Sequence, residues 1–424
     1  MTTIAKLLLE RAEAHPTAVA TREFRLGIWE EATWADVRND AATIGAGLRS
    51  LGVGRGDVVA IVAANGPAWL TVEFGALGLG ASVLAVPPNF SPATTRRVVE
   101  QARPKVVVVG DQEQFDKLDG VDSIVIVAAT RGLRHLDRPG RVEADRMLSV
   151  DQLRGRGSTT AAWLQSVDQM GGDDNTLAVT FATPVSGHVS LVATTNGQAI
   201  AGGRAAGASL ALDPSDSMVV LRSFADPAEH SVSVIGSLLS GVQLHFGEEG
   251  LSAAAMHQVQ PTVVHASAEW LNGQAAMVER LHQDARGVKR LALDRGLVDR
   301  VPASTLRTHP HRPMIRLAGL AVLAVVVAFL FATLSGNDVM RVLVVVAIVV
   351  AAGFALLLSG HGAAGPARRR LGLSRCRAVV IERGAVGERA LGLLGALDVP
   401  VVALDAPAPA GDPTHRALAS EVVV

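Results

Sequence analysis

The side chains that most often do chemistry are scarce in this 424-residue chain. It contains no tyrosine, and its only lysines are Lys6, Lys105, Lys117 and Lys289. Chemistry that needs a phenol is therefore excluded, and no catalytic amine can come from the last third of the chain. Cys376 is the only cysteine, which excludes an intramolecular disulfide and a cysteine-based zinc cluster. The net charge is −1, so an overall basic character is absent, and we predict no nucleic-acid partner.

Other patterns have a structural and a functional interpretation. Residues 75–80 hold three glycines without the order of a dinucleotide-binding fingerprint, which favours helix packing. His309 and His311 lie two apart beside prolines, and this favours a linker over a metal site. No G-x-S-x-G or S-x-x-K nucleophile motif occurs, and we predict no catalytic residue and no metal site. Three isolated histidines are predicted to be core or surface residues: His230, His245 and His265.

The apolar pattern predicts an α/β fold. Short strand-like runs alternate with helical stretches over the first 130 residues, which is typical of βαβ units and a parallel sheet. Helices are expected over residues 3–14, 33–50, 67–79, 94–102, 269–283 and 387–397, with Thr33 as an N-cap. Strands are expected over residues 58–63, 83–86, 106–109, 123–127, 259–265, 378–381 and 399–404.

These elements fall into five predicted regions. Residues 1–130 form a first α/β subdomain, 131–172 a polar connector with one or two short helices, and 173–312 a second α/β region. Residues 313–362 form a transmembrane helical hairpin, and 363–424 form a last α/β segment with an irregular C-terminal tail.

Two uncharged segments, residues 317–334 and 342–358, predict the hairpin. They would span roughly 27 and 25 Å as helices, close to the ~30 Å hydrocarbon layer. Arginines precede the first segment at Arg312 and Arg316 and follow the second at residues 368–370. Positive charge on both flanks predicts an inner or plasma membrane protein whose termini and α/β region are cytoplasmic, in contact with membrane lipid. The alternative is a pair of buried core helices.

The first 118 residues resemble a known family. A helix, the sequence GVGRGD at residues 52–57, a strand that ends near Asn65, a second helix and the sequence ASVLAVPP follow one another. This order resembles the start of the adenylate-forming, or AMP-binding, superfamily, specifically the bacterial long-chain acyl-CoA synthetases. A weaker resemblance continues over residues 173–283 and 371–402. It implies the parallel-sheet layers of that family's large domain, with the hairpin as an insertion.

The resemblance also implies a phosphate-binding loop that this chain has altered. Family members activate a carboxylate with ATP and pass the acyl group to a thiol, and a T-S-G-T-T-G-x-P-K-G loop holds the phosphates. The matching stretch is residues 181–191. The family lysine falls on Ser190 and the last glycine on Leu191. The first glycine falls on Pro184, which has no N–H group.

Three positions of this loop keep the family's residue type. Thr183, Ser186 and Gly187 are therefore the candidate cofactor-binding residues. His188 could add partial charge, but an ordinary histidine is mostly neutral near pH 7.

Further catalytic parts are altered. The aromatic-threonine-glutamate motif that stacks adenine and holds magnesium falls on residues 405–409, with Ala408 and Pro409 at its last two positions. Glu382 lies near another altered signature, where a solvated surface carboxylate is favoured over a cation ligand. The chain ends at Val424, and we expect that the family's small lysine-bearing domain is missing.

These observations favour a membrane-anchored, catalytically inactive acyl-CoA synthetase-like protein that acts as a scaffold or regulatory subunit in lipid metabolism, with a protein partner and without a cofactor. One alternative is a sensor that binds an acyl-adenylate, acyl-CoA or nucleotide. Another is an acyl-CoA ligase completed by a partner chain. ATP or AMP and Mg²⁺ are expected only under these alternatives.

Overall fold

The computed structural model describes residues 2–118, 120–121, 123–127, 147–157, 160–185, 188–248, 252–284, 368–382, 386, 388–404 and 422–423. The predicted hairpin, residues 313–362, lies outside these ranges, as do its segments 317–334 and 342–358. Within the described ranges, no helix combines the length and the apolar character that crossing a membrane requires.

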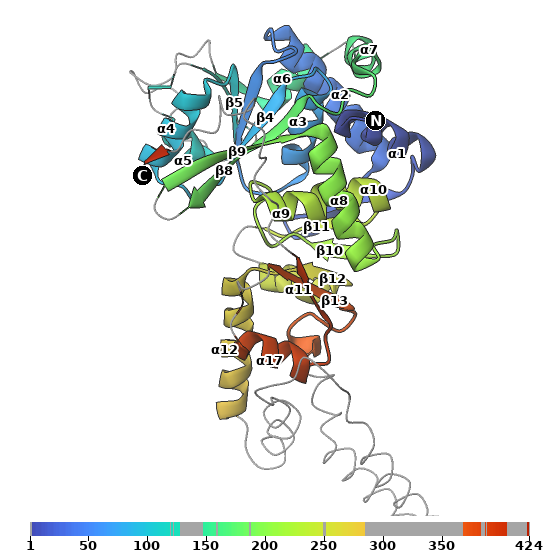
Figure 1. Ribbon diagram of the computed structural model, residues 1–424, viewed down its shortest axis with the longest axis vertical. Coiled ribbons are helices and arrows are strands. Elements are labelled where there is room, and N and C mark those ends of the chain that lie inside the picture. Colours follow the sequence, from blue (N-terminus) through green and yellow to red (C-terminus); the bar gives the residue numbers. More distant parts are fainter. Residues whose placement is uncertain are drawn as a thin grey trace, which may run out of the picture. The chain divides into compact units, whose positions relative to one another are not determined.

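The larger sheet of the described chain has eight strands in the order β15-β9-β8-β4-β3-β5-β6-β7 (Figure 1). Neighbouring strands are parallel from β8 to β7, whereas β9 pairs antiparallel with β8 and with β15. The bounds are β3 (Val58–Val62), β4 (Ser82–Val86), β5 (Val106–Val109), β6 (Ile124–Val127), β7 (Met147–Ser149), β8 (Leu177–Val185), β9 (His188–Thr195) and β15 (Val422–Val423).

The second sheet has seven described strands in the order β14-β13-β12-β10-β11-β1-β2. The pairs from β13 to β1 are parallel, and only β1 and β2 form an antiparallel hairpin among the registered pairs. The bounds are β1 (Val19–Arg25), β2 (Ile28–Thr33), β10 (Ser217–Val219), β11 (Gln243–Phe246), β12 (Val263–His265), β13 (Ala378–Glu382) and β14 (Val401–Leu404).

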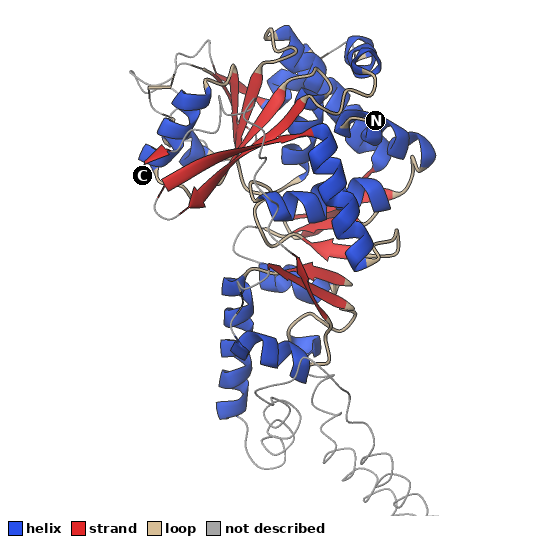
Figure 2. Cartoon of the chain, viewed as in Figure 1, coloured by secondary structure: helices blue, strands red, loops and turns tan. Residues whose placement is uncertain are grey.

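Helices cover both faces of the eight-stranded sheet (Figure 2). One face packs on α4 (Pro92–Ala102) and α5 (Gln112–Asp116). The other face shares a continuous core with the seven-stranded sheet and with α1 (Ile4–Ala14), α2 (Trp34–Ser50), α3 (Pro67–Leu77) and α8 (Asn196–Leu210). Such packing of parallel strands between apolar layers explains why their sequences are nearly all apolar.

Glycines let α2 and α3 approach each other closely. A Cβ atom at Gly75 would lie 2.9 Å from the carbonyl oxygen of Ala41, and one at Gly78 would lie 2.2 Å from the Trp163 ring. The indole N–H of Trp163 donates a 2.8 Å hydrogen bond to the Gly75 carbonyl. The predicted packing role of the glycines in residues 75–80 is therefore confirmed for Gly75 and Gly78.

The connector was predicted over residues 131–172 with one or two short helices, and its described part has two, α6 (Val150–Arg156) and α7 (Ala161–Met170). Its described part also adds β7 to the edge of the larger sheet, which polar composition did not predict. The β1–β2 hairpin was likewise not predicted. Its turn has Leu26 and Gly27 at φ 52° and 86°, and none of the residues of its edge strand β2 is buried, so the strand lacks an apolar run.

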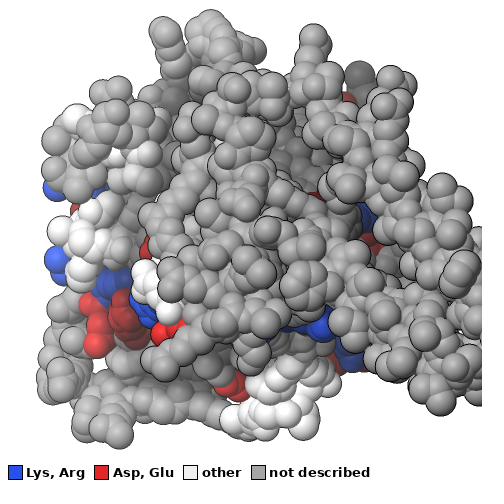
Figure 3. All heavy atoms as spheres, turned by 90° about the horizontal axis from the view of Figure 1, so that it is seen from below, with Lys and Arg blue, Asp and Glu red and all other residues white. Residues whose placement is uncertain are grey.

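The chain divides into two compact units. The first comprises Met1–Ser267, Arg375–Ala385 and Val402–Val424, and it contains both sheets apart from Val401. The second comprises Ala268–Ser374 and Val386–Val401, and its described helices α12 (Ala268–Asp284) and α17 (Glu388–Ala396) contact each other. Where described charged residues are visible in Figure 3, basic and acidic side chains lie beside one another.

Candidate functional site

The stretch predicted to be a phosphate loop is mostly paired strand. Residues 181–185 of β8 pair with residues 188–192 of β9, so that Thr183 lies opposite Ser190 and Pro184 opposite Val189. Only Ser186 and Gly187 stand between the last paired positions, and both lie outside the described residues. The other backbone groups of this stretch belong to a two-stranded ladder (Figure 1), whereas a phosphate cradle needs several free N–H groups.

Thr183 is the one candidate cofactor-binding residue that the structure describes. Its Oγ1 atom is buried, and no described group lies in hydrogen-bonding range of it. Pro184 is exposed and Ser190 is partly buried. Ala408 and Pro409 lie outside the described residues.

A charged cluster occupies the carboxyl edge of the seven-stranded sheet. Arg222 follows β10, and its guanidinium lies 2.5 Å from Asp226 and also pairs with Glu382, the last residue of β13. Burial lowers the pKa of Arg222, but the attraction of Asp226 and Glu382 outweighs it, and the pKa is raised. Glu382, predicted to be a solvated surface carboxylate, is 29% exposed and also forms an ion pair with Arg222.

The other sheet contributes to the same place through Asn65, which follows β3. Its amide N–H donates a 2.5 Å hydrogen bond to the carbonyl of Arg222, and its Oδ1 accepts a 2.8 Å bond from the N–H of Phe224. Asn65 therefore holds the segment after β10 against the carboxyl end of β3. Open parallel sheets bind their ligands at such carboxyl ends, which makes this cluster the candidate functional site.

Two buried glutamate–histidine pairs lie behind the charged cluster. Glu73 Oε1 lies 2.7 Å from His230 Nε2 and forms a hydrogen bond with it. Glu229 Oε2 lies 2.6 Å from His265 Nδ1, but these two atoms are not aligned for a hydrogen bond. The hydroxyl of Ser233 donates a hydrogen bond to Glu229. All four side chains of the pairs are at most 2% exposed. A buried carboxylate requires a partner of this kind, since an unpaired charge in an apolar core is strongly destabilising.

The local backbone places these residues on one irregular helix. Asp226 caps α9 (Pro227–Glu229), and its Oδ1 accepts hydrogen bonds from the next backbone N–H groups at 2.9 and 3.0 Å. A π-helical turn, η2 (His230–Ile235), follows and leads into α10 (Gly236–Ser240). Single π-helical turns are frequent at functional sites because they re-aim neighbouring side chains. Here the two consecutive residues Glu229 and His230 reach different partners.

Aromatic rings enclose His230. The ring centroids of Phe181 and Trp69 lie 5.3 and 6.2 Å from that of His230, and Trp69 also packs on Phe224 at 5.2 Å. Phe181 belongs to β8, two residues before Thr183. The aromatic contacts therefore link His230 to the β8–β9 hairpin, which contains the stretch predicted to be a phosphate-binding loop.

The described arrangement is poorly suited to hold phosphates. Arg222 is already matched by two carboxylates, so the three described charges of this cluster sum to −1. No lysine stands at Ser190 to offset this. Within the described part of the chain, no three His, Cys, Asp or Glu side chains are placed to share a metal ion.

Sequence reasoning missed the glutamate–histidine pairs. The sequence predicted His230 and His265 to be isolated core or surface residues. Both are core residues, but each lies beside a glutamate. A usable signal was present at Glu73, a single charge inside the otherwise apolar helix α3. Its partner lies 157 residues away, which no local pattern reveals.

Comparison with known proteins assigns the chain to a family. The model of the family described as "AMP-binding enzyme" matches residues 8–386. The rice (Oryza sativa subsp. japonica) protein 4-coumarate–CoA ligase-like 9 is 30% identical over 155 residues, which cover 37% of this chain and 27% of that protein. The long-chain-fatty-acid–CoA ligase heimdall of Drosophila melanogaster is 33% identical over 93 residues, or 22% of this chain and 14% of that protein. The matches thus span about a quarter or less of these relatives.

Solved structures share the fold. A long-chain-fatty-acid–CoA ligase from Archaeoglobus fulgidus superposes with a TM-score of 0.53 at 15% identity, over 65% of this chain and 53% of that one. The protein VinN superposes with a TM-score of 0.51 at 20% identity, over 66% of this chain and 64% of that one. At these identities the likeness concerns the fold alone, and it confirms the predicted α/β architecture with parallel-sheet layers.

Proposed function

The chain belongs to the AMP-binding enzyme family, and from this premise we propose that it is a catalytically inactive, acyl-CoA synthetase-like member of it. It acts as a membrane-anchored scaffold or regulatory subunit in fatty-acid and lipid metabolism. The observation that carries the loss of activity is the charge balance at the carboxyl edge. There Arg222 is neutralised by Asp226 and Glu382, and a triphosphate would meet excess negative charge.

The β8–β9 hairpin supports the same proposal. Strand pairing continues to Val185 and resumes at His188, which leaves few free backbone donors where the family binds phosphate. Pro184 adds no N–H group, and Ser190 adds no positive charge. Two independent features, missing donors and unfavourable charge, thus oppose ATP binding.

The membrane anchor rests on the sequence alone. Residues 317–334 and 342–358 have the length and purity of membrane-spanning helices and arginine flanks on both sides. We propose that this hairpin contacts lipid at an inner or plasma membrane, with both termini and the α/β region in the cytoplasm. We propose that the anchored chain binds a protein partner in the same membrane.

Calorimetric titration of the detergent-purified full chain with ATP·Mg tests the inactivity. We expect no heat of binding and no release of AMP when a fatty acid and coenzyme A are added. The variant Pro184→Gly/Ser190→Lys restores two family residues and serves as a comparison, and we expect it to remain inactive because the charge at Glu382 persists. Micromolar binding and AMP release by the unmodified chain would refute the proposal.

Membrane association is tested separately. The full chain should remain in the pellet after alkaline carbonate extraction of membranes, whereas a chain without residues 313–362 should be released. Protease added to inside-out vesicles should digest residues 1–300. Protection of those residues would contradict the proposed topology, and release of the full chain would contradict the anchor.

One observation favours a second function, that of an acyl-adenylate sensor. Thr183 Oγ1 is buried without a described hydrogen-bonding partner, and such a group is destabilising unless something completes it. A non-hydrolysable acyl-adenylate analogue would accept this hydrogen bond. Tight binding that Thr183→Val weakens by about tenfold would support the sensor. If the folded protein does not bind the analogue, the sensor is refuted and the scaffold proposal stands.

A further inference from the structure

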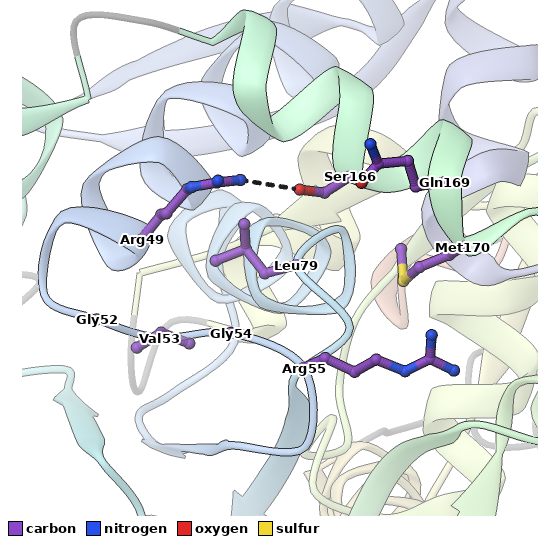
Figure 4. Close-up of a pocket in the computed structure, with 9 residues that line it drawn as sticks. All are labelled: Arg49, Gly52, Val53, Gly54, Arg55, Leu79, Ser166, Gln169 and Met170. Carbon is purple, nitrogen blue, oxygen red and sulfur yellow. Dashed lines mark hydrogen bonds between the residues drawn. The ribbon is translucent and has the colours of Figure 1, made fainter.

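The first unit has a hollow that lies away from the carboxyl-edge cluster (Figure 4). It has a volume of about 410 Å³, which is within the range of small-molecule sites. Its walls come from the end of α2, the loop that leads into β3, the end of α3 and the last two turns of α7. All these elements belong to one compact unit.

Strand direction separates this hollow from the candidate functional site. The wall residues Gly52–Arg55 precede β3, and Leu79 precedes β4, so the hollow lies at the amino edge of the parallel strands. Asn65 and the Arg222 cluster lie at the carboxyl edge. A ligand here would therefore not occupy the position of a family nucleotide.

The hollow has an apolar lining and two cations. Val53, Leu79 and Met170 supply the apolar surface, and Figure 4 shows the side chains of Arg49 and Arg55 beside them. Val53 and Leu79 are buried, whereas both arginines are exposed. A lining of this kind suits a molecule with one anionic end and a short apolar body.

The two arginines differ in their partners. Arg55 pairs with Asp173 at 2.9 Å. Arg49 Nη1 donates only to neutral oxygens on α7, the Ser166 hydroxyl at 3.2 Å and the Ala162 carbonyl at 3.4 Å. No described carboxylate lies within ion-pair distance of Arg49, so its charge is uncompensated there and its Nε and Nη2 groups can accept a further partner.

The other basic residues near the hollow are already held in ion pairs, and the exposed Asp168 of α7 forms no described ion pair with Arg49. Lys105 pairs with Asp57 at 3.1 Å just behind the loop, which neutralises both. Asp173 matches Arg55. One guanidinium, that of Arg49, is left over. A guanidinium presents a planar set of donors that fits carboxylate and phosphate oxygens.

We propose that this hollow binds a small oxyanion, a carboxylate or a phosphate monoester with a short apolar tail. Its oxygens contact Arg49 and its tail lies on Val53, Leu79 and Met170. The ligand bridges α2 and α7, the same two helices that Arg49 already joins. This site is independent of the proposed function, because the carboxyl edge takes no part in it.

Titration of the full chain in detergent with inorganic phosphate, butyl phosphate and butyrate tests the site. Butyl phosphate should bind more tightly than inorganic phosphate, because only the former covers the apolar lining. A comparison of butyl phosphate with butyrate identifies which oxyanion is preferred. Absence of binding by all three at about 10 mM would overturn the proposal.

Variants locate the binding. Arg49→Gln should weaken butyl phosphate binding by about tenfold or more, because it removes the uncompensated charge. Arg38→Gln is the matched control on the same helix, since Arg38 contacts the side chain of its neighbour Asn39 and does not line the hollow. The Arg38→Gln variant should bind butyl phosphate with unchanged affinity. Equal weakening by both substitutions would mean a general surface attraction and would overturn the site.

A third variant removes the competing carboxylate. Asp173→Asn frees Arg55 to contact the ligand, so binding should tighten by about threefold or more. Unchanged or weaker binding would contradict the placement of the anion at Arg49, beside Arg55. Circular dichroism of each variant verifies that the fold is intact.

Discussion

His245 should make the stability of this protein depend strongly on pH. It lies on β11 in register with Arg22 of β1 and is only 2% exposed. Neither ring nitrogen has a described hydrogen-bonding partner. Burial, followed by the positive charges of Arg22 and Arg375, lowers the pKa of His245 from 6.5 to about 4.

The sign of the effect follows from where protons bind. Between pH 6.5 and about 4 the unfolded chain holds a proton on residue 245 that the folded chain does not hold. The folded state is therefore fully favoured above the unfolded pKa, and its stability falls as the pH drops through this window. For these two pKa values the loss is about 2 kcal/mol between pH 7 and pH 5, and about 3 kcal/mol by pH 4.

Urea unfolding of the full chain at a series of pH values would measure this. His245→Phe keeps a ring beside Trp29, whose centroid lies 5.8 Å from that of His245, but it cannot take up a proton. The difference in unfolding free energy between the unmodified chain and this variant isolates one histidine from all other titrating groups. It should change by about 2 kcal/mol between pH 7 and pH 5.

A free-energy difference between the unmodified chain and His245→Phe that is constant over this pH range would refute the reasoning. It would mean that residue 245 takes up a proton as readily in the folded protein as in the unfolded chain.

Two further predictions concern packing and buried charge. Gly78→Ala should lower the unfolding free energy by about 2 kcal/mol, because its Cβ would lie 2.2 Å from the Trp163 ring. Gly155→Ala on α6 meets nothing within 4 Å and should be neutral or slightly stabilising in the same urea assay, so equal losses would contradict the packing role. Glu73→Ala should destabilise the protein by about 1–3 kcal/mol, because it removes the hydrogen bond between Glu73 and His230 and leaves that buried ring without its partner. The double variant Glu73→Leu/His230→Leu should recover most of this loss, and a double variant no more stable than Glu73→Ala would show that the pairing is not the cause.

Local elements were predictable where a short stretch contains its own signals. Thr33 and Asp36 form a capping box, and α2 begins at the next residue after Thr33. Pro67 stands at the first position of α3. The all-valine run of residues 106–109 is the fully buried strand β5. In each case the backbone conformation follows from residues within one or two turns.

Elements with weak local signals were missed. The β1–β2 hairpin has an exposed edge strand, so its residues alternate little between apolar and polar. Strand β7 has only three residues and is defined by its pairing with β6. Both exist because a neighbouring strand supplies hydrogen bonds, and that neighbour is not visible in the local sequence.

The sequence by itself determined the α/β class, the family resemblance and the loss of family residues at Pro184 and Ser190, because these depend on local periodicity and residue type. Only the tertiary structure decided which charges meet. Arg222 and Glu382 are 160 residues apart, and Glu73 and His230 are 157 apart. Arg222 and Glu382 become partners because β10 and β13, which are distant in the chain, end at the same edge of one sheet. Glu73 of α3 and His230 of η2 become partners because their elements pack in the core, where a buried polar group is stable only beside a partner.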